Sequence, residues 1–275
     1  MGEAVLSVRW GWHRRLATDK GVFWVDTPLD LQEVKPFTRE INDSWCVVAC
    51  LPYWEARFRE VGLNVAGVIP RPIDVYAAEK ARKLEGRWRE RYGRYIVTVG
   101  GDQIIAPPRL PRKGLDMYDK LAGYVKEKYG LNAVAVSNWV HFKNVTRIPL
   151  GSLSEEELLS LIRDAELFVW PSRCEGFGLP PLEAMAVGQV VVCCDNPTNQ
   201  HLVGVKFDYR DEVKVFMPEI SRFYTAFDYS FEALKEAVDY ALGLTREERE
   251  DLVAEAMEAA SYYRPDIIAQ LLVEV

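Results

Sequence analysis

Two glutamates with seven residues between them are the residues whose types and spacing most directly indicate chemistry. Glu175 lies in a glycine-bearing segment, and Glu183 follows the paired prolines Pro180 and Pro181. Proline suits the first turn of a helix because its φ is fixed and it lacks an N–H donor. We therefore expect a helix at 181–186, with Glu183 in its first turn. The start of such a helix attracts phosphate through oriented amides and a partial positive charge.

The glycines between the two glutamates favour a ligand at this helix start. Gly176 and Gly178 would let a ligand approach the backbone closely. A carboxylate accepts paired hydrogen bonds from vicinal hydroxyls, so Glu175 and Glu183 could hold sugars on either side of a diphosphate. Two structural alternatives stay open, since a first-turn glutamate can simply complement the helix dipole and Glu175 can be an ordinary loop carboxylate.

A second segment has the composition of an anion site. Gly100 and Gly101 follow an apolar run, and Arg112 and Lys113 come shortly afterwards. The glycines permit a tight turn, and Lys113 can act as a point charge toward a phosphate.

Apolar runs rich in β-branched residues alternate with amphipathic stretches, which predicts an α/β fold. We predict strands at 4–8, 21–25, 45–51, 64–69, 95–99, 133–136, 166–170 and 189–194. We predict helices at 53–61, 115–129, 154–165, 181–186, 231–242, 245–262 and 266–275, with the charged segment 74–94 as an inter-domain connection. Short apolar strands separated by helices indicate a doubly wound parallel sheet, which binds ligands at the carboxyl ends of its strands.

The composition of the chain limits the classes of partner that it is expected to bind. The 275 residues are 49% apolar and carry a formal net charge of -7, which is ordinary for a globular protein and argues against a nucleic-acid partner. The sequence has neither a bilayer-spanning apolar run nor a signal-peptide pattern, so we expect a cytoplasmic protein. The basic and aromatic stretch 9–15 could contact a lipid surface, a glycan or nucleic acid. Few Asn and Gln beside many charged residues lean toward a hot-adapted source.

The sequence gives no sign of a metal centre. Its five cysteines form no Cys-x-x-Cys pair, its three histidines are isolated, and no Asp-x-Asp occurs. It also lacks the glycine motifs of nicotinamide dehydrogenases and P-loop NTPases. We expect no metal and no cofactor.

The block from Glu175 to Ala186, preceded by 169–172, resembles the signature of family 4 of the retaining glycosyltransferases. The segment 112–114 is similar to another donor-site element of that family, and 68–74 to the end of its first domain. The resemblance implies a GT-B-like architecture with two Rossmann-type domains. It places a reduced acceptor-side α/β domain and linker at 1–90, and a nucleotide-sugar-binding domain with a doubly wound parallel sheet at 91–275.

The resemblance also implies roles for individual residues. Glu175 would contact the transferred sugar, Lys113 would neutralise the departing phosphate, and Glu183 would bind the ribose hydroxyls. Glu175 and Lys113 are thus the expected catalytic residues. The expected donor-binding residues are Gly100, Gly101, Arg112, Ser172, Gly176, Phe177, Gly178, Leu179 and Glu183. The donor would be a nucleotide-diphospho-sugar, used without a metal.

Two departures from the family pattern leave alternatives open. The family usually has an arginine where this chain has Gly101, and Arg109 or Arg112 could substitute for it. The first domain is also short for the family. The expected activity is retaining sugar transfer to an unidentified acceptor, which could be a glycan, lipid, protein or small molecule. The alternative is a non-catalytic nucleotide-sugar or glycan-binding module, or a half-enzyme that needs a partner chain.

Overall fold

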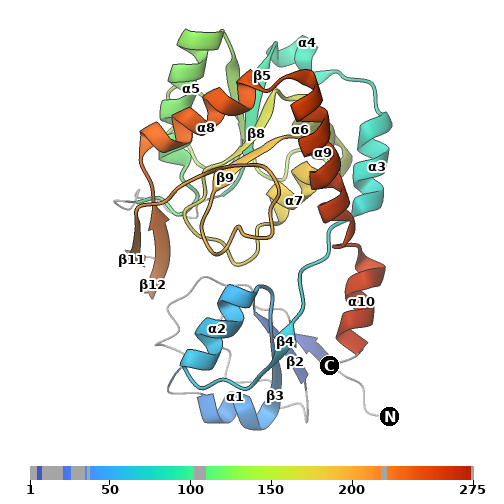
Figure 1. Cartoon of the computed structure of the whole chain (residues 1–275), viewed down its shortest axis with the longest axis vertical. Coiled ribbons are helices and arrows are strands. Elements are labelled where there is room, and N and C mark those ends of the chain that lie inside the picture. The colour runs from blue at the N-terminus through green and yellow to red at the C-terminus, as the bar shows by residue number, and fades with distance from the viewer. Residues whose placement is uncertain are drawn as a thin grey trace.

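The computed structural model describes residues 5–7, 21–25, 35, 38–101, 110–217 and 222–273, which form two α/β units (Figure 1). Strands β1 to β12 are Val5–Ser7, Gly21–Val25, Trp45–Ala49, Val65–Val68, Tyr95–Val99, Asn132–Val136, Thr146–Ile148, Leu167–Trp170, Val191–Cys194, Val205–Phe207, Asp211–Met217 and Arg222–Asp228. Helices α1 to α10 are Thr38–Ser44, Pro52–Glu60, Val75–Lys83, Trp88–Tyr92, Leu115–Tyr129, Glu155–Asp164, Leu179–Ala186, Phe231–Gly243, Arg246–Ser261 and Pro265–Val273.

The second unit is built on a six-stranded sheet in the order β10-β9-β8-β5-β6-β7, with every neighbouring pair parallel. In chain order this is the 3-2-1-4-5-6 arrangement of a doubly wound sheet, so the predicted fold class is confirmed. The order reverses between β5 and β8. In such sheets ligands bind at the carboxyl ends of the two strands that flank the reversal. The loops after β5 and β8 are the ones that carry Lys113 and Glu175.

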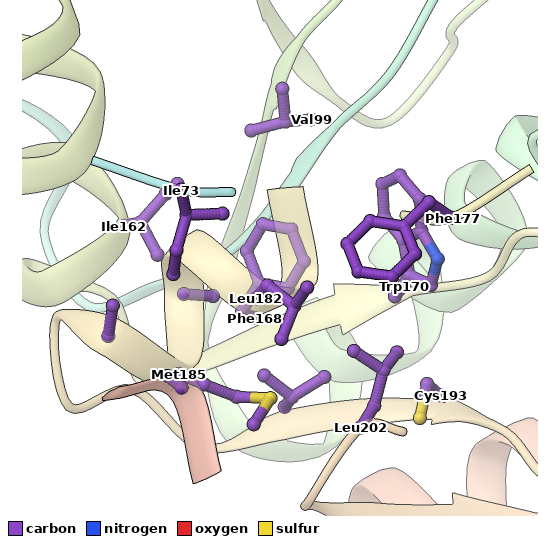
Figure 2. Close-up of a cluster of buried hydrophobic side chains, with 14 of the residues drawn as sticks. Ile73, Val99, Ile162, Phe168, Trp170, Phe177, Leu182, Met185, Cys193 and Leu202 are labelled. Carbon is purple, nitrogen blue, oxygen red and sulfur yellow. The ribbon is translucent and has the colours of Figure 1, made fainter. Parts of the chain in front are cut away.

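Alternation along the strands gives this sheet two buried faces. One face carries Val97, Phe168 and Cys193, which pack against α6 and α7, and α3 packs on those two helices. The other carries Ile96, Val169 and Val192, which pack against α5 and α8. Figure 2 shows the first of these clusters, in which Phe177 lies close to Trp170. Because both faces are covered, the strands are apolar throughout, which is why they were readable in the sequence.

Local signals fix the ends of the helices around the sheet. Ser154 and Thr245 begin α6 and α9 with capping boxes, in which the hydroxyl and a third-position glutamate satisfy free backbone donors. Helix α5 is bounded by Gly114 and Gly130, both in the left-handed region with φ of 63° and 67°. The predicted limits of α5 therefore match the observed helix.

The first unit is a four-stranded parallel sheet in the order β1-β2-β3-β4, with α1 and α2 packed against it. Helix α10 leaves the second unit and returns to this sheet (Figure 1). Its Ile268 is buried together with Val48 and Ile69 of the first unit. The C-terminal helix therefore joins the two units.

Several elements differ from their predictions. The segment predicted as a connection contains helices α3 and α4, and α3 packs against α6 and α7 through its buried alanines. The charged side chains of α3 are exposed to solvent, so the sequence pattern of this segment indicated a solvated linker. The short strands β7 and β10 and the hairpin formed by β11 and β12 were not predicted. The hairpin was missed because it lacks a short glycine-bearing turn signal.

Replacing Gln189 by Ala is expected to lower the free energy of unfolding by about 2–4 kcal/mol, because buried polar groups lose their partners. The buried Gln189 amide donates to the Ile162 and Ala165 carbonyls at 2.9 and 2.8 Å and accepts from the Val190 N–H at 2.8 Å. Chemical unfolding measures the change. The exposed Gln200→Ala is the matched control. Equal effects of the two changes would contradict this role of Gln189.

Candidate functional site

The loops after β5 and β8 touch through their backbones. The Arg173 N–H donates to the Arg112 carbonyl at 2.8 Å. Gly114 makes this approach possible, because a Cβ there would lie 1.9 Å from the Pro171 carbonyl oxygen. Gly114 also has a φ of 63°, in the region that favours glycine. The contact sets Arg112 and Lys113 opposite the Glu175 loop.

Lys113 and Glu175 form a buried ion pair at this contact. The Lys113 Nζ lies 2.6 and 2.8 Å from the two Glu175 carboxylate oxygens, and Arg112 lies 3.5 Å from one of them. Lys113 also lies over the Trp170 ring, 4.9 Å from its centroid. The structure therefore brings both predicted catalytic residues and Arg112 together at the point where the strand order reverses.

The charges around Glu175 keep it ionised. The residue is only 4% exposed, and burial alone would raise the pKa of its carboxyl. The charges of Lys113 and Arg112 and hydrogen bonds from Lys113 and Ser172 outweigh burial, so the pKa of Glu175 lies below its ordinary value. An ionised Glu175 accepts hydrogen bonds and offers negative charge, but it has no proton to donate.

Arg173 holds the two loops together and was missed in the sequence. Its fully buried guanidinium donates to the Pro111 carbonyl at 2.7 Å and to both Asp116 carboxylate oxygens at 2.8 and 3.1 Å. It also lies 3.6 Å from Asp228 and over the Tyr229 ring. Arg173 thus connects the loop after β5, the loop after β8 and the end of the β11–β12 hairpin. Glu175 was predicted as a site residue, but Arg173 was not, because no spacing in the sequence indicates the partners of Arg173.

The segment 176–179 is held from the first unit. The Gly176 carbonyl accepts hydrogen bonds from Cys50 Sγ at 3.0 Å and Trp54 Nε1 at 2.8 Å. Phe177 is buried and stacks on His201, with ring centroids 4.7 Å apart. Burial lowers the pKa of His201 to about 4, so its ring is neutral near pH 7.

Helix α7 begins at Leu179, two residues earlier than predicted, after Gly178 with a φ of 88°. The correction has a consequence for the anion site. Pro180 and Pro181 lie inside the first turn, where they supply no N–H donors, so Gly178 and Leu179 carry the free donors that this helix start retains. The predicted phosphate site at the start of this helix therefore has fewer backbone N–H donors than expected. The side-chain cations Lys113 and Arg112 therefore become the more important candidate ligands for an anion.

Glu183 lies one turn into α7, apart from the Lys113–Glu175 pair. Burial raises the pKa of this half-buried carboxyl to about 7, and the charge of Glu155 at the start of α6 adds to the increase. The structure therefore places the two glutamates in opposite electrostatic environments. Glu175 is neutralised by two cations, whereas Glu183 faces another carboxylate.

The glycines after β5 lie beside the site. The Lys113 side chain passes Gly100, where a Cβ would lie 3.7 Å from its Cδ and Cγ. At Gly101 a Cβ would lie 2.8 Å from Asn138 Oδ1, so Asn138 occupies the space of a larger residue. Of the two candidate replacements for the missing arginine, Arg112 lies at the site and Arg109 falls outside the described residues. The stretch 9–15 also falls outside them.

Among residues 38–101, 110–217 and 222–273, no group of three or more His, Cys, Asp or Glu side chains could hold a metal ion. No helix in the described part of the chain is long and apolar enough to cross a bilayer.

Comparison with solved structures identifies the class of fold. A trehalose 6-phosphate synthase from Burkholderia multivorans superposes with a TM-score of 0.69 at 11% identity, covering 92% of this chain and 64% of that one. The Anabaena protein HepE, solved in complex with UDP and glucose, superposes with a TM-score of 0.69 at 14% identity, covering 93% and 71%. The fold is GT-B-like.

Sequence comparison finds similarity to glycosyltransferases. Residues 143–258, less than half of the chain, match the family model of glycosyl transferases group 1. The protein named glycosyltransferase 41 of Sulfolobus islandicus filamentous virus is 27% identical over 247 residues, covering 88% of this chain and 66% of that protein. The serotype-specific mannosyltransferase WbdA of Escherichia coli is 28% identical over 143 residues, covering 46% and 17%. The chain thus spans about two thirds of the viral relative.

Replacing Glu183 by Gln is expected to change how stability depends on pH. The folded-state pKa of about 7 exceeds the ordinary 4.5, so folding favours the protonated carboxyl. This stabilisation is complete below about pH 4.5 and is lost as the pH rises toward 7. Across that window, the free energy of unfolding of the wild type should fall relative to Glu183→Gln.

Chemical unfolding at a series of pH values measures this difference. The matched control is Glu255→Gln, at an exposed position of α9. Parallel pH profiles for the wild type and Glu183→Gln would show that Glu183 is not perturbed in this way.

Proposed function

We propose that this chain transfers a glycosyl group from a nucleotide-diphospho-sugar to an acceptor, with retention of the anomeric configuration. The observation that carries the proposal is the buried Lys113–Glu175 pair, with Arg112 beside it, at the reversal of the strand order. The match to the group 1 glycosyl transferases and the GT-B-like fold support it.

The proposed donor binds across the loops after β5 and β8. Its diphosphate would lie near Lys113 and Arg112, with the amides of Gly176, Phe177, Gly178 and Leu179 and the Ser172 hydroxyl on the other side. Lys113 is held by Glu175, and a diphosphate would compete for its charge. Gly100 lets the Lys113 side chain pass close to the backbone, and Asn138 lies against Gly101.

The proposed step breaks the bond between the anomeric carbon and the diphosphate oxygen. The acceptor hydroxyl oxygen bonds to the same carbon from the same face, and its proton passes to the departing diphosphate. Lys113 and Arg112 stabilise the negative charge that grows on the diphosphate. Because Glu175 stays ionised, it serves as a hydrogen-bond acceptor for the transferred sugar and stabilises the positive charge on the anomeric carbon.

We also propose that the reaction needs no metal ion, since Lys113 and Arg112 supply positive charge where the diphosphate would lie. Glu183 would accept hydrogen bonds from the two ribose hydroxyls in its ionised form. The raised pKa of Glu183 near 7 makes nucleotide binding weaker as the pH falls below 7.

Replacing Lys113 by Met is expected to weaken the binding of nucleotide diphosphates by about 10- to 100-fold, the value of one or two charge-assisted hydrogen bonds. Calorimetry with UDP, GDP and their sugars measures it, with and without a chelator. Lys113→Arg keeps the charge, and Lys126→Ala on the exposed face of α5 is the matched control. Equal affinities in the wild type and Lys113→Met would remove Lys113 from the site.

Replacing Glu175 by Gln is expected to lower the rate of sugar transfer or donor hydrolysis by about 100-fold, while nucleotide affinity changes much less. The rate falls because the negative charge opposite the anomeric carbon is lost. Thermal unfolding of each variant separates loss of function from loss of folding. If the wild type binds nucleotide-sugars but turns none over with any acceptor, the binding-module alternative replaces the transferase.

A further inference from the structure

The hairpin formed by β11 and β12 is attached directly to the candidate site. The Phe227 N–H donates to the Arg173 carbonyl at 2.8 Å, two residues before Glu175. The Tyr224 hydroxyl donates to the Leu110 carbonyl at 2.6 Å, three residues before Lys113. A two-stranded hairpin is at best marginally stable alone, so these anchors hold it in place. It lies on the side of the second unit that faces the first (Figure 1).

Strand register gives this hairpin two distinct faces. On the inner face, the pairs Val213–Ala226 and Val215–Tyr224 pack into the core. The opposite face carries the pairs Glu212–Phe227, Lys214–Thr225 and Phe216–Phe223, which we call the outer face. At its base, Phe227 packs edge-to-face on Tyr53 of α2, with centroids 6.0 Å apart. The outer face is therefore directed toward the first unit.

The far end of the outer face presents two aromatic rings. Phe216 and Phe223 are 46% and 43% exposed, and their rings lie 5.0 Å apart at a tilt of 52°. Phe223 and Phe227 are four positions apart, which is about 14 Å along an antiparallel strand. The rings are thus more than one sugar ring away from the base of the hairpin.

The buried hydroxyl of Tyr53, a residue of α2, belongs to the side chain that packs on the base of the outer face. Tyr53 Oη is enclosed and has no hydrogen-bond partner within the described part of the chain. Burial raises the pKa of Tyr53, and the charge of Glu212 raises it further, so the hydroxyl remains protonated. Cys174, the residue before Glu175, is close enough to act on the same group. A buried hydroxyl without a partner is costly, and an added ligand hydroxyl would satisfy it.

We propose that the outer face of the β11–β12 hairpin and Tyr53 bind the acceptor, and that the acceptor is an oligosaccharide rather than a single sugar. This inference rests on the proposed function. Tyr53 would hydrogen-bond the sugar next to the transferred group, and Phe216 and Phe223 would stack on a ring further along the chain. Carbohydrate rings have C–H faces that pack on the negative face of an aromatic ring and hydroxyls that need polar partners.

The chemistry of the face favours a glycan over the other occupants. The same face carries the exposed Glu212 and Lys214, whose side chains can bind hydroxyls. A membrane surface is disfavoured because the chain is acidic and Glu212 is exposed on the same face. A second copy of the chain would need a larger apolar area than two partly exposed rings.

The test uses an array of defined α- and β-linked oligosaccharides of increasing length with the matching monosaccharides, and the full chain saturated with UDP or GDP. Glycans that bind the wild type are expected to bind the double variant Phe216→Ala, Phe223→Ala about tenfold or more weakly, with monosaccharide binding unchanged. The single variant Phe223→Tyr keeps the aromatic ring and should bind these glycans like the wild type. The double variant Phe216→Leu, Phe223→Leu lacks both rings and should bind them as weakly as the double Ala variant. The matched control is Tyr240→Ala, which removes an exposed aromatic ring on α8, away from the hairpin.

Tyr53→Phe removes only the hydroxyl and should weaken the binding of short and long glycans by similar factors. If glycans bind the Leu and Ala double variants as well as they bind the wild type, the hairpin inference fails while nucleotide binding still supports the proposed function. Self-association that the double variant abolishes, or binding to phosphatidylserine vesicles, would replace the glycan by a second copy or a membrane. If the wild type binds no nucleotide-sugar, the proposed function fails instead.

Discussion

The close approach of two loops at Gly114 and Pro171 is the constraint on which the site depends. A side chain at residue 114 would collide with the Pro171 carbonyl, so only glycine allows the loop after β5 to lie against the loop after β8. Arg173 then ties both loops to Asp116 and to the hairpin end. These contacts put Lys113 beside Glu175, and burial strengthens the attraction between the two charges.

The buried charges explain why the surrounding backbone is so closely held. A buried carboxylate or guanidinium is costly unless its partners are fixed in place. Glu175 has Lys113 and Arg112, and Arg173 has Asp116 and Asp228. Neither set would persist if the loops moved apart, so the geometry of the site and the packing of the loops stabilise one another.

The two units meet at the same place. Cys50 and Trp54 of the first unit bond the Gly176 carbonyl, and Tyr53 packs against the hairpin. Helix α10 returns from the second unit to the first sheet. Opening the two units would therefore disturb the Glu175 loop directly, which couples their relative position to the site.

Local patterns in the sequence predicted four of the six strands of the second sheet, most helix limits and the candidate site at Lys113 and Glu175. These features depend on apolar strands buried on both faces, capping residues, and charges beside glycines. The sequence did not determine the α3 and α4 packing, the partners of Arg173 or the start of α7 before the two prolines. Only the tertiary structure decided that Arg112, rather than a residue at 101, lies beside Glu175, that Glu183 faces Glu155, and that an unpredicted hairpin borders the site. Those outcomes depend on residues far apart in the chain, whose distances no local spacing contains.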